Sequence, residues 1–136
     1  MEKSINLKNE ISEVARLNKF IDVSCQTQGL SIEFTNELKL AIEEVVVNSI
    51  NYGFIDGEDG EIIVSLKFQP DEVLVEIKDN GKEFDPTLEN NVDIDSGLDE
   101  RQIGGLGLFL VKQLSDSITY RRVGNLNLLS LNKIYK

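Results

Sequence analysis

The stretch that decides the fold is EIIVSLKFQPDEVLVEIKDNG, residues 61–81. It holds two runs in which apolar residues alternate with more polar ones, on either side of Pro70-Asp71. The alternating apolar residues are Ile62, Val64, Leu66, Phe68, Val73, Val75 and Ile77. Because a period of two turns one face of each run toward a core, we expect two strands. The Pro-Asp turn joins them as an antiparallel hairpin that ends at Asp79-Asn80-Gly81.

Upstream of this hairpin, apolar residues recur at helical spacing within residues 11–21 and 34–50. Asn9 and Ser31 are residue types that cap helix N-termini, so we expect each of them to begin a helix. A weak alternation at residues 4–8 predicts a short first strand. Two helices therefore separate the first strand from the hairpin.

Downstream, an apolar segment at residues 108–114 predicts a short helix, and residues 118–134 predict a second hairpin around Gly124-Asn125. Since the strands are mostly joined as antiparallel pairs, a doubly wound parallel sheet is excluded. We expect an α+β fold: a two-layer sandwich with a mixed, mostly antiparallel sheet and helices on one face. Its length suits a single domain over residues 1–136.

Composition narrows the function. Lys and Arg number 14 and Asp and Glu 24, giving a net charge of −10, so we expect no direct nucleic-acid partner. The chain has no histidine and a single cysteine, Cys25, which excludes histidine acid–base chemistry and a zinc site. No secretory signal and no apolar run long enough to cross a bilayer are visible, so we expect a cytoplasmic protein without a membrane partner.

Three polar residues share one face of the second predicted helix. Glu44 and Asn48 are four residues apart, and Asn48 and Asn51 are three apart. This face borders the apolar stripe, where a pocket can form. An isolated E-x-x-x-N pattern is more typical of a solvated polar edge, and spacing alone does not separate Glu44 from the adjacent Glu43.

Asp79-Asn80-Gly81 ends an apolar strand. A partly buried carboxylate at that point needs hydrogen-bond donors. The exocyclic amine of adenine is such a donor, whereas the oxygen of guanine at the same position would be repelled. Taken alone, however, the tripeptide favours a simple turn.

Gly104-Gly105-Leu106-Gly107 opens the short third helix. Glycines let the backbone approach a ligand closely, and a helix N-terminus offers free N–H groups to phosphates. This is not a Walker A loop, because no Gly-Lys-Ser/Thr follows, and it does not match the G-x-G-x-x-G fingerprint. The alternative is a flexible loop that ends in a helix.

In this order and spacing, the three motifs resemble the N, G1 and G2 boxes of the GHKL (Bergerat-fold) ATPase superfamily. Within it, the chain most resembles the anti-sigma factor serine/threonine kinases of bacteria. The resemblance covers essentially the whole chain and implies a histidine-kinase-like ATPase domain in the Bergerat ATP-binding fold. The irregular, acidic residues from about 82 to 104 would form its lid.

The resemblance implies a role for each motif. Asn48 would help hold Mg²⁺ against the phosphates of ATP, and Glu44 would be the general base. Asp79 would hydrogen-bond adenine, and Gly81 would give the base room. The rest of the implied nucleotide-binding set is Asn51, Arg101, Gly104, Gly105 and Gly107.

The resemblance also implies partners: a sigma factor that the protein sequesters, an anti-anti-sigma protein that it phosphorylates on Ser or Thr, and a second copy in a homodimer. Two other functions stay open at this stage. One is an ATP-dependent switch that binds a partner without chemistry. The other is a histidine-kinase-type catalytic domain, whose acceptor histidine would lie on another chain. One departure is Glu83, which stands where the superfamily usually has a second glycine.

Overall fold

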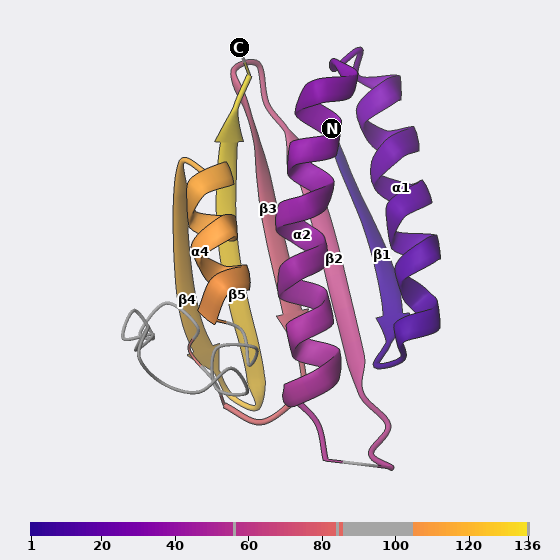
Figure 1. Ribbon diagram of the computed structural model, residues 1–136, viewed down its shortest axis with the longest axis vertical. Helices are drawn as coiled ribbons and strands as arrows, with labels where there is room; N and C mark the ends of the chain where they lie inside the picture. Colours follow the sequence, from indigo (N-terminus) through magenta and orange to yellow (C-terminus); the bar gives the residue numbers. More distant parts are fainter. Residues whose placement is uncertain (56, 84, 86–104, 136) are drawn as a thin grey trace.

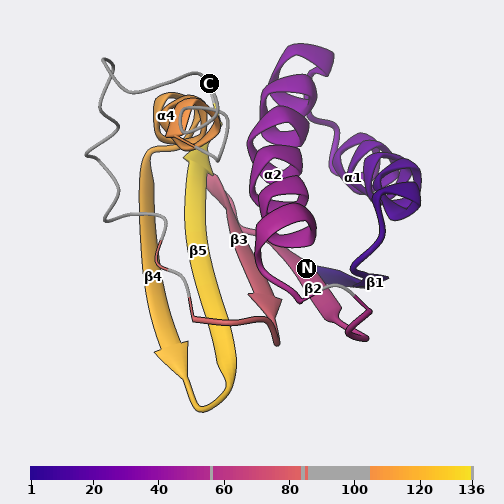
Figure 2. The ribbon, with the colours of Figure 1, turned by 60° about the horizontal axis from the view of Figure 1, so that its bottom comes forward.

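The computed structural model describes residues 1–55, 57–83, 85 and 105–135, and these form two layers (Figures 1 and 2). One layer is a five-stranded sheet and the other consists of helices on a single face of it. The helices are a 3₁₀ turn, η1 (Ile11–Glu13), and α1 (Val14–Thr27), α2 (Ile32–Tyr52) and α4 (Gly105–Leu114). The strands are β1 (Glu2–Lys8), β2 (Glu61–Phe68), β3 (Glu72–Asp79), β4 (Ser117–Val123) and β5 (Leu126–Ile134).

The strand order is β1-β2-β3-β5-β4, and every pairing in it is antiparallel. The two-layer α+β prediction is confirmed, and so are both predicted hairpins. The sheet is simpler than the mixed one expected, since these five strands include no parallel pair. The last hairpin inserts β5 beside β3, which places the C-terminal strand in the interior of the sheet (Figure 1).

One helix cap is confirmed and the other is wrong. The hydroxyl of Ser31 accepts a hydrogen bond from the backbone N–H of Phe34 at 3.0 Å, so it begins α2 as expected. Asn9 does not cap a helix. Its side chain instead donates to the carbonyl of Glu58 and accepts from the N–H of Gly60, both at 3.0 Å, and so holds the loop before β2. These contacts join residues 49 and 51 positions apart, so a local sequence pattern does not reveal them.

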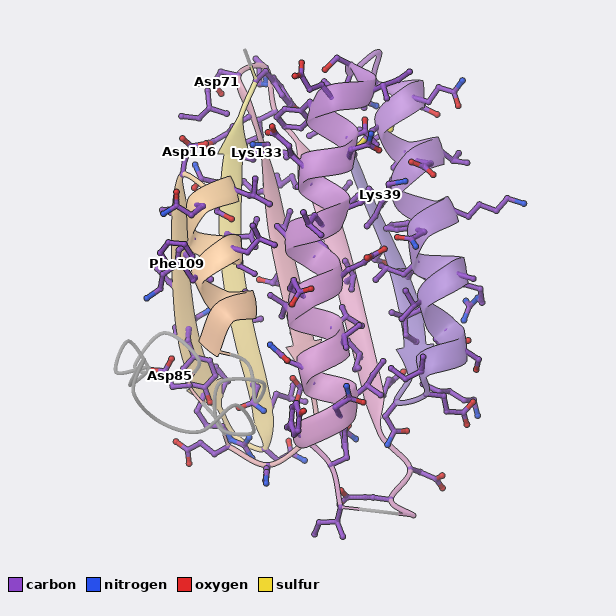
Figure 3. All side chains as sticks on the ribbon, in the orientation of Figure 1. Lys39, Asp71, Asp85, Phe109, Asp116 and Lys133 are labelled. Carbon is purple, nitrogen blue, oxygen red and sulfur yellow. The ribbon has the colours of Figure 1, made fainter. Side chains whose placement is uncertain are left out.

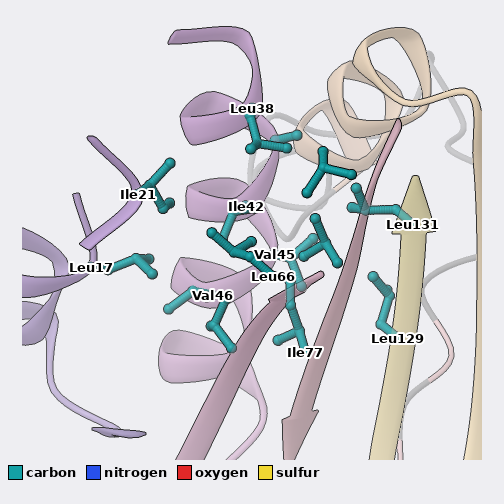
Figure 4. Packing of buried hydrophobic residues seen from close by; sticks show 14 of the residues in the cluster. Leu17, Ile21, Leu38, Ile42, Val45, Val46, Leu66, Ile77, Leu129 and Leu131 are labelled. Carbon is teal, nitrogen blue, oxygen red and sulfur yellow. The ribbon is translucent and has the colours of Figure 1, made fainter. Parts of the chain in front are cut away.

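The core lies between the helices and the sheet (Figure 4). Its fully or almost fully buried side chains include Leu17, Ile21, Leu38, Ile42, Val46, Leu66, Ile77, Leu129 and Leu131. Each such side chain stabilises the fold by about 1.5–3 kcal/mol relative to exposure. Because α2 contributes to this core along most of its length, its last turns are held against the end of β3, where the site lies.

Lys133 of β5 ties the far end of the two layers together (Figure 3). Its ammonium forms an ion pair with Glu37 of α2 at 2.9 Å and donates to the carbonyl of Leu114, the last residue of α4, at 3.1 Å. It also lies 5.3 Å from the centre of the Phe34 ring. A cation at a helix C-terminus is favourable because it meets unpaired carbonyls.

Candidate functional site

A pocket opens between α2, β3, α4 and β5, where β3 stops. Its cavity volume is about 40 Å³, and the hollow around it, open solvent included, is about 570 Å³. Its lining residues are Val45, Asn48, Ser49, Gly53, Ile77, Asp79, Lys82, Val111, Tyr120, Asn127 and Leu129. Aliphatic walls with a few polar groups at one end suit a flat, largely apolar ligand whose edge carries hydrogen-bonding groups. Two predicted site residues, Asn48 and Asp79, are thereby brought to one cavity although they lie on different layers.

The α2 wall carries the first motif. Asn48 lines the pocket and Glu44 lies one turn before it, and both are half-buried. Neither side chain forms a hydrogen bond or an ion pair with another residue in the described part of the chain. Polar side chains on one helix face that are left without protein partners are available to a ligand. Asn51, the third member, is exposed and lies outside the pocket lining.

The Asp79 carboxylate is the centre of the polar end. It is only 8 % exposed. Its Oδ1 accepts from the backbone N–H of Gly81 and from Nδ2 of Asn127, both at 2.9 Å. Among the described residues, its Oδ2 accepts a single long bond of 3.4 Å, from the hydroxyl of Ser49. A carboxylate can accept about four hydrogen bonds, so Oδ2 keeps capacity for a donor in the pocket.

Asn127 holds this carboxylate in place from β5. It stands directly opposite Asp79 in the β3–β5 register, and it is 7 % exposed. Its Nδ2 also donates to the carbonyl of Lys82 at 2.8 Å. Its Oδ1 accepts from the hydroxyl of Tyr120 at 2.5 Å and from Arg122 at 3.1 Å. Because the donors and the oxygen of the Asn127 amide are all hydrogen-bonded, the network holds the Asp79 carboxylate in one orientation, as specific recognition of a ligand requires.

Gly81 has a packing reason for being glycine. A Cβ at this position would lie 2.3 Å from the carbonyl oxygen of Gly53, at the end of α2, and 3.1 Å from Oδ1 of Asp79. The same carbonyl accepts from the N–H of Lys82 at 2.9 Å. The absence of a side chain therefore lets the chain leaving β3 contact the last turn of α2 and close one side of the pocket.

The Gly-rich motif is described only in part. α4 begins at Gly105, three residues before the helix predicted over 108–114, so Gly107 lies in its first turn. α4 packs against α2 on the same side of the sheet (Figure 1). Its Val111 lines the pocket. Gly104 and Arg101 lie outside the described residues, as does nearly all of the predicted lid at 82–104.

The sequence motifs missed several members of the site: Ser49, Lys82, Tyr120, Arg122 and Asn127. The most central, Asn127, carried one weak signal, because it is a polar residue with leucines on both sides in a strand. Lys82 adds a positive charge to the pocket lining. The signal for Tyr120 and Arg122 is absent from the sequence, because their contacts depend on the pairing of β4 with β5.

No group of three or more His, Cys, Asp or Glu side chains in the described part of the chain could hold a metal ion by itself. No helix there is long and apolar enough to span a bilayer.

Known proteins resemble this chain in sequence. The sequence model of the family described as "Histidine kinase-like ATPase domain" matches residues 7–133. A serine-protein kinase RsbW of Listeria monocytogenes is 37 % identical over 94 residues, which cover 66 % of this chain and 60 % of that protein. The RsbW of Oceanobacillus iheyensis is 30 % identical over 125 residues, which cover 87 % of this chain and 76 % of that protein.

Solved structures share the fold at low sequence identity. One contains RsbU and RsbW domains of a Mycobacterium tuberculosis protein; its TM-score is 0.72 at 14 % identity, covering 100 % of this chain and 33 % of that one. The other is the histidine kinase domain of a blue-light activated kinase from Erythrobacter litoralis. Its TM-score is 0.55 at 15 % identity, covering 90 % of this chain and 59 % of that one.

Proposed function

Because the chain belongs to the histidine kinase-like ATPase domain family, and within it to the anti-sigma factor serine/threonine kinases, we propose that it binds Mg·ATP and phosphorylates an anti-anti-sigma protein. The observation that carries the proposal is the pocket in which the buried Asp79 keeps one carboxylate oxygen available and which Asn48 of α2 also lines. The chain spans 60 % of the first curated relatives, so the activity of those proteins enters here as a proposal.

Adenine is the base that suits the polar end. Oδ2 of Asp79 is a charged acceptor, and the 6-amino group of adenine is a donor that would bond to it. The 6-oxo group of guanine would face the carboxylate with like partial charge. A buried polar group discriminates strongly between partners that pair with it and partners that leave it unpaired.

The phosphates would lie toward α2 and the start of α4. The N-terminus of α4, with Gly105 and Gly107 in its first turn, offers backbone N–H groups and the positive end of a helix dipole. We place Gly104, Arg101 and Asn51 in the same nucleotide-binding set, with residues 82–104 as the lid of a single domain. Asn48 fits Mg²⁺, because this ion takes few protein oxygens, and the amide of Asn48 has no other hydrogen bond among the described residues.

Phosphoryl transfer needs positioning and charge neutralisation more than covalent help from the protein. When bound, Mg²⁺ neutralises charge that develops on the phosphate oxygens. Glu44 would take the proton from the acceptor Ser or Thr hydroxyl as its oxygen bonds to the γ-phosphorus and ADP leaves. Glu44 suits this role because it lies on the helix face that Asn48 occupies and forms no ion pair within the described residues.

The regulatory part of the proposal follows from the family. The protein would sequester a sigma factor, phosphorylate the anti-anti-sigma protein and act as a homodimer in the cytoplasm. Nucleic acid and membranes are not part of this proposal.

The test compares two adjacent acids. Purified parent, Glu44→Gln and Glu43→Gln proteins are incubated with Mg·ATP and the anti-anti-sigma protein encoded beside the gene, and phosphate transfer to protein is followed. We expect Glu44→Gln to lose transfer by about 10²-fold or more while still binding ATP, and Glu43→Gln to keep both. Parent protein that binds ATP but transfers nothing to any such partner would leave the non-catalytic switch as the function. Parent protein that binds no ATP would overturn the whole proposal.

A further inference from the structure

Beyond the motif residues, a row of three side chains crosses the sheet at the edge of the pocket. Asp79 of β3 pairs with Asn127 of β5, and Asn127 pairs with Arg122 of β4. Directly paired residues of antiparallel strands project from the same face. The row therefore lies on the face that carries the helices, and it runs from the carboxylate at the pocket to an arginine at the edge strand.

The guanidinium of Arg122 donates hydrogen bonds to one side chain of this row and to two backbone carbonyls. Its Nη1 donates to Oδ1 of Asn127 at 3.1 Å and to the carbonyl of Gly81 at 3.0 Å. Its Nε donates to the carbonyl of Gly124 at 3.2 Å, in the β4–β5 turn. One guanidinium thus joins the turn, the amide behind Asp79 and the backbone that leaves β3.

The orientation of the Asn127 amide depends on these donors. Its Nδ2 gives both hydrogens, to Asp79 and to Lys82, and its Oδ1 takes bonds from Tyr120 and Arg122. An asparagine side chain has two donors and two acceptor positions, so all four are occupied. Rotating the amide by half a turn would place its oxygen against the carboxylate, which is repulsive. Asn127 is therefore a support for Asp79 and not itself a free ligand group.

We propose that Arg122 is a positioning residue for the base subsite. It acts through Asn127 and the carbonyl of Gly81, and it fixes the orientation of the Asp79 carboxylate, whose Oδ2 has room for a donor in the pocket. Without its guanidinium, the amide of Asn127 loses one of its donors, and the carbonyl of Gly81 loses a charge-assisted bond. Asp79 then samples orientations that accept a base less selectively. This inference rests on the proposed binding of ATP.

The variant that tests it is Arg122→Met, which keeps an unbranched stem and removes all donors. The matched control is Arg121→Met, because Arg121 is the neighbouring, exposed residue on the opposite face of the same strand. Dissociation constants for Mg·ATP and Mg·GTP are measured by titration calorimetry, and melting is followed without nucleotide. Arg122→Met should raise the dissociation constant for Mg·ATP by about tenfold, the effect of one lost charge-assisted hydrogen bond. It should also lower the preference for ATP, which is the dissociation constant for Mg·GTP divided by that for Mg·ATP. Arg121→Met should change neither.

The ratio of the two dissociation constants decides the test, because a purely structural loss would weaken the binding of ATP and GTP by the same factor. Arg122→Lys should keep only part of the parent protein's preference for ATP over GTP, since one ammonium does not reproduce the planar fork of a guanidinium. If Arg122→Met does not fold, two milder variants replace it: Arg122→Lys loses the planar fork of the guanidinium, and Tyr120→Phe loses the hydroxyl that donates to Asn127. Both should lower the preference for ATP over GTP.

An unchanged ATP-to-GTP ratio in folded Arg122→Met, or in both substitutes, overturns the inference. In that case Asp79→Asn should still weaken ATP binding, and the proposed function stands. Parent protein that binds neither nucleotide removes the proposed function and this inference together.

Discussion

Replacing Asp79 by asparagine should change the base preference of the pocket more than the stability of the fold. In the structure, Oδ1 holds the two short bonds, from Gly81 and Asn127, and Oδ2 holds the long one from Ser49. An asparagine keeps an oxygen at the first position and places an NH₂ group at the second, where the Ser49 hydroxyl can accept. All three contacts therefore persist, in neutral form.

The magnitudes follow from these contacts. Two short bonds lose their charge assistance, which costs about 1–2 kcal/mol, and burying a neutral amide in place of a carboxylate recovers part of it. The loss of the bond from the adenine amine costs about 1.5–3 kcal/mol in ATP affinity. The new NH₂ group can donate to the 6-oxo group of guanine and gain about 0.5–1 kcal/mol. The ATP-to-GTP ratio should thus shift toward GTP by about 2–4 kcal/mol, or roughly 30- to 700-fold.

The assay is calorimetric titration of the parent and of Asp79→Asn with both nucleotides, together with urea unfolding of each. Asp71→Asn is the control, because Asp71 is an exposed carboxylate at the other end of β3 (Figure 3). It should leave both nucleotide affinities unchanged. Parent-like affinity for ATP in a folded Asp79→Asn protein would show that this carboxylate does not contact the base.

Other changes test the surroundings of the site. Gly81→Ala should destabilise the fold by about 1–3 kcal/mol in urea unfolding, because its Cβ would lie 2.3 Å from the backbone oxygen of Gly53. Lys133→Met should cost about 1–2 kcal/mol in the same assay, since it removes the ammonium that bonds Glu37 and the last carbonyl of α4, and ATP affinity should stay unchanged. Burial raises the pKa of the Cys25 thiol. Because the unfolded thiol ionises at lower pH than the folded one, the free energy of unfolding should fall as pH rises above the usual thiol range, and Cys25→Ala should lack this decline.

Much of the fold could be predicted because its signals are local. Alternating apolar residues marked β2 and β3, and the Ser31 cap marked the start of α2 where the structure has it. The start of α4 lies three residues before the predicted one, at Gly105. Asn9 shows the limit of such signals. Its side chain satisfies the backbone of residues 58–60 instead of a helix end, and a contact across that distance competes with local capping without leaving a trace in the pattern.

The sequence by itself determined the types of element, their order and the three motifs, because helical and strand periods and turn chemistry involve only neighbouring residues. Tertiary structure alone decided which oxygen of Asp79 stays available. That choice depends on Asn127, 48 positions away, and on Arg122 beyond it, and both are placed by strand register. Register follows from packing apolar faces against α2 and α4, and this is a property of the whole core and not of any one segment.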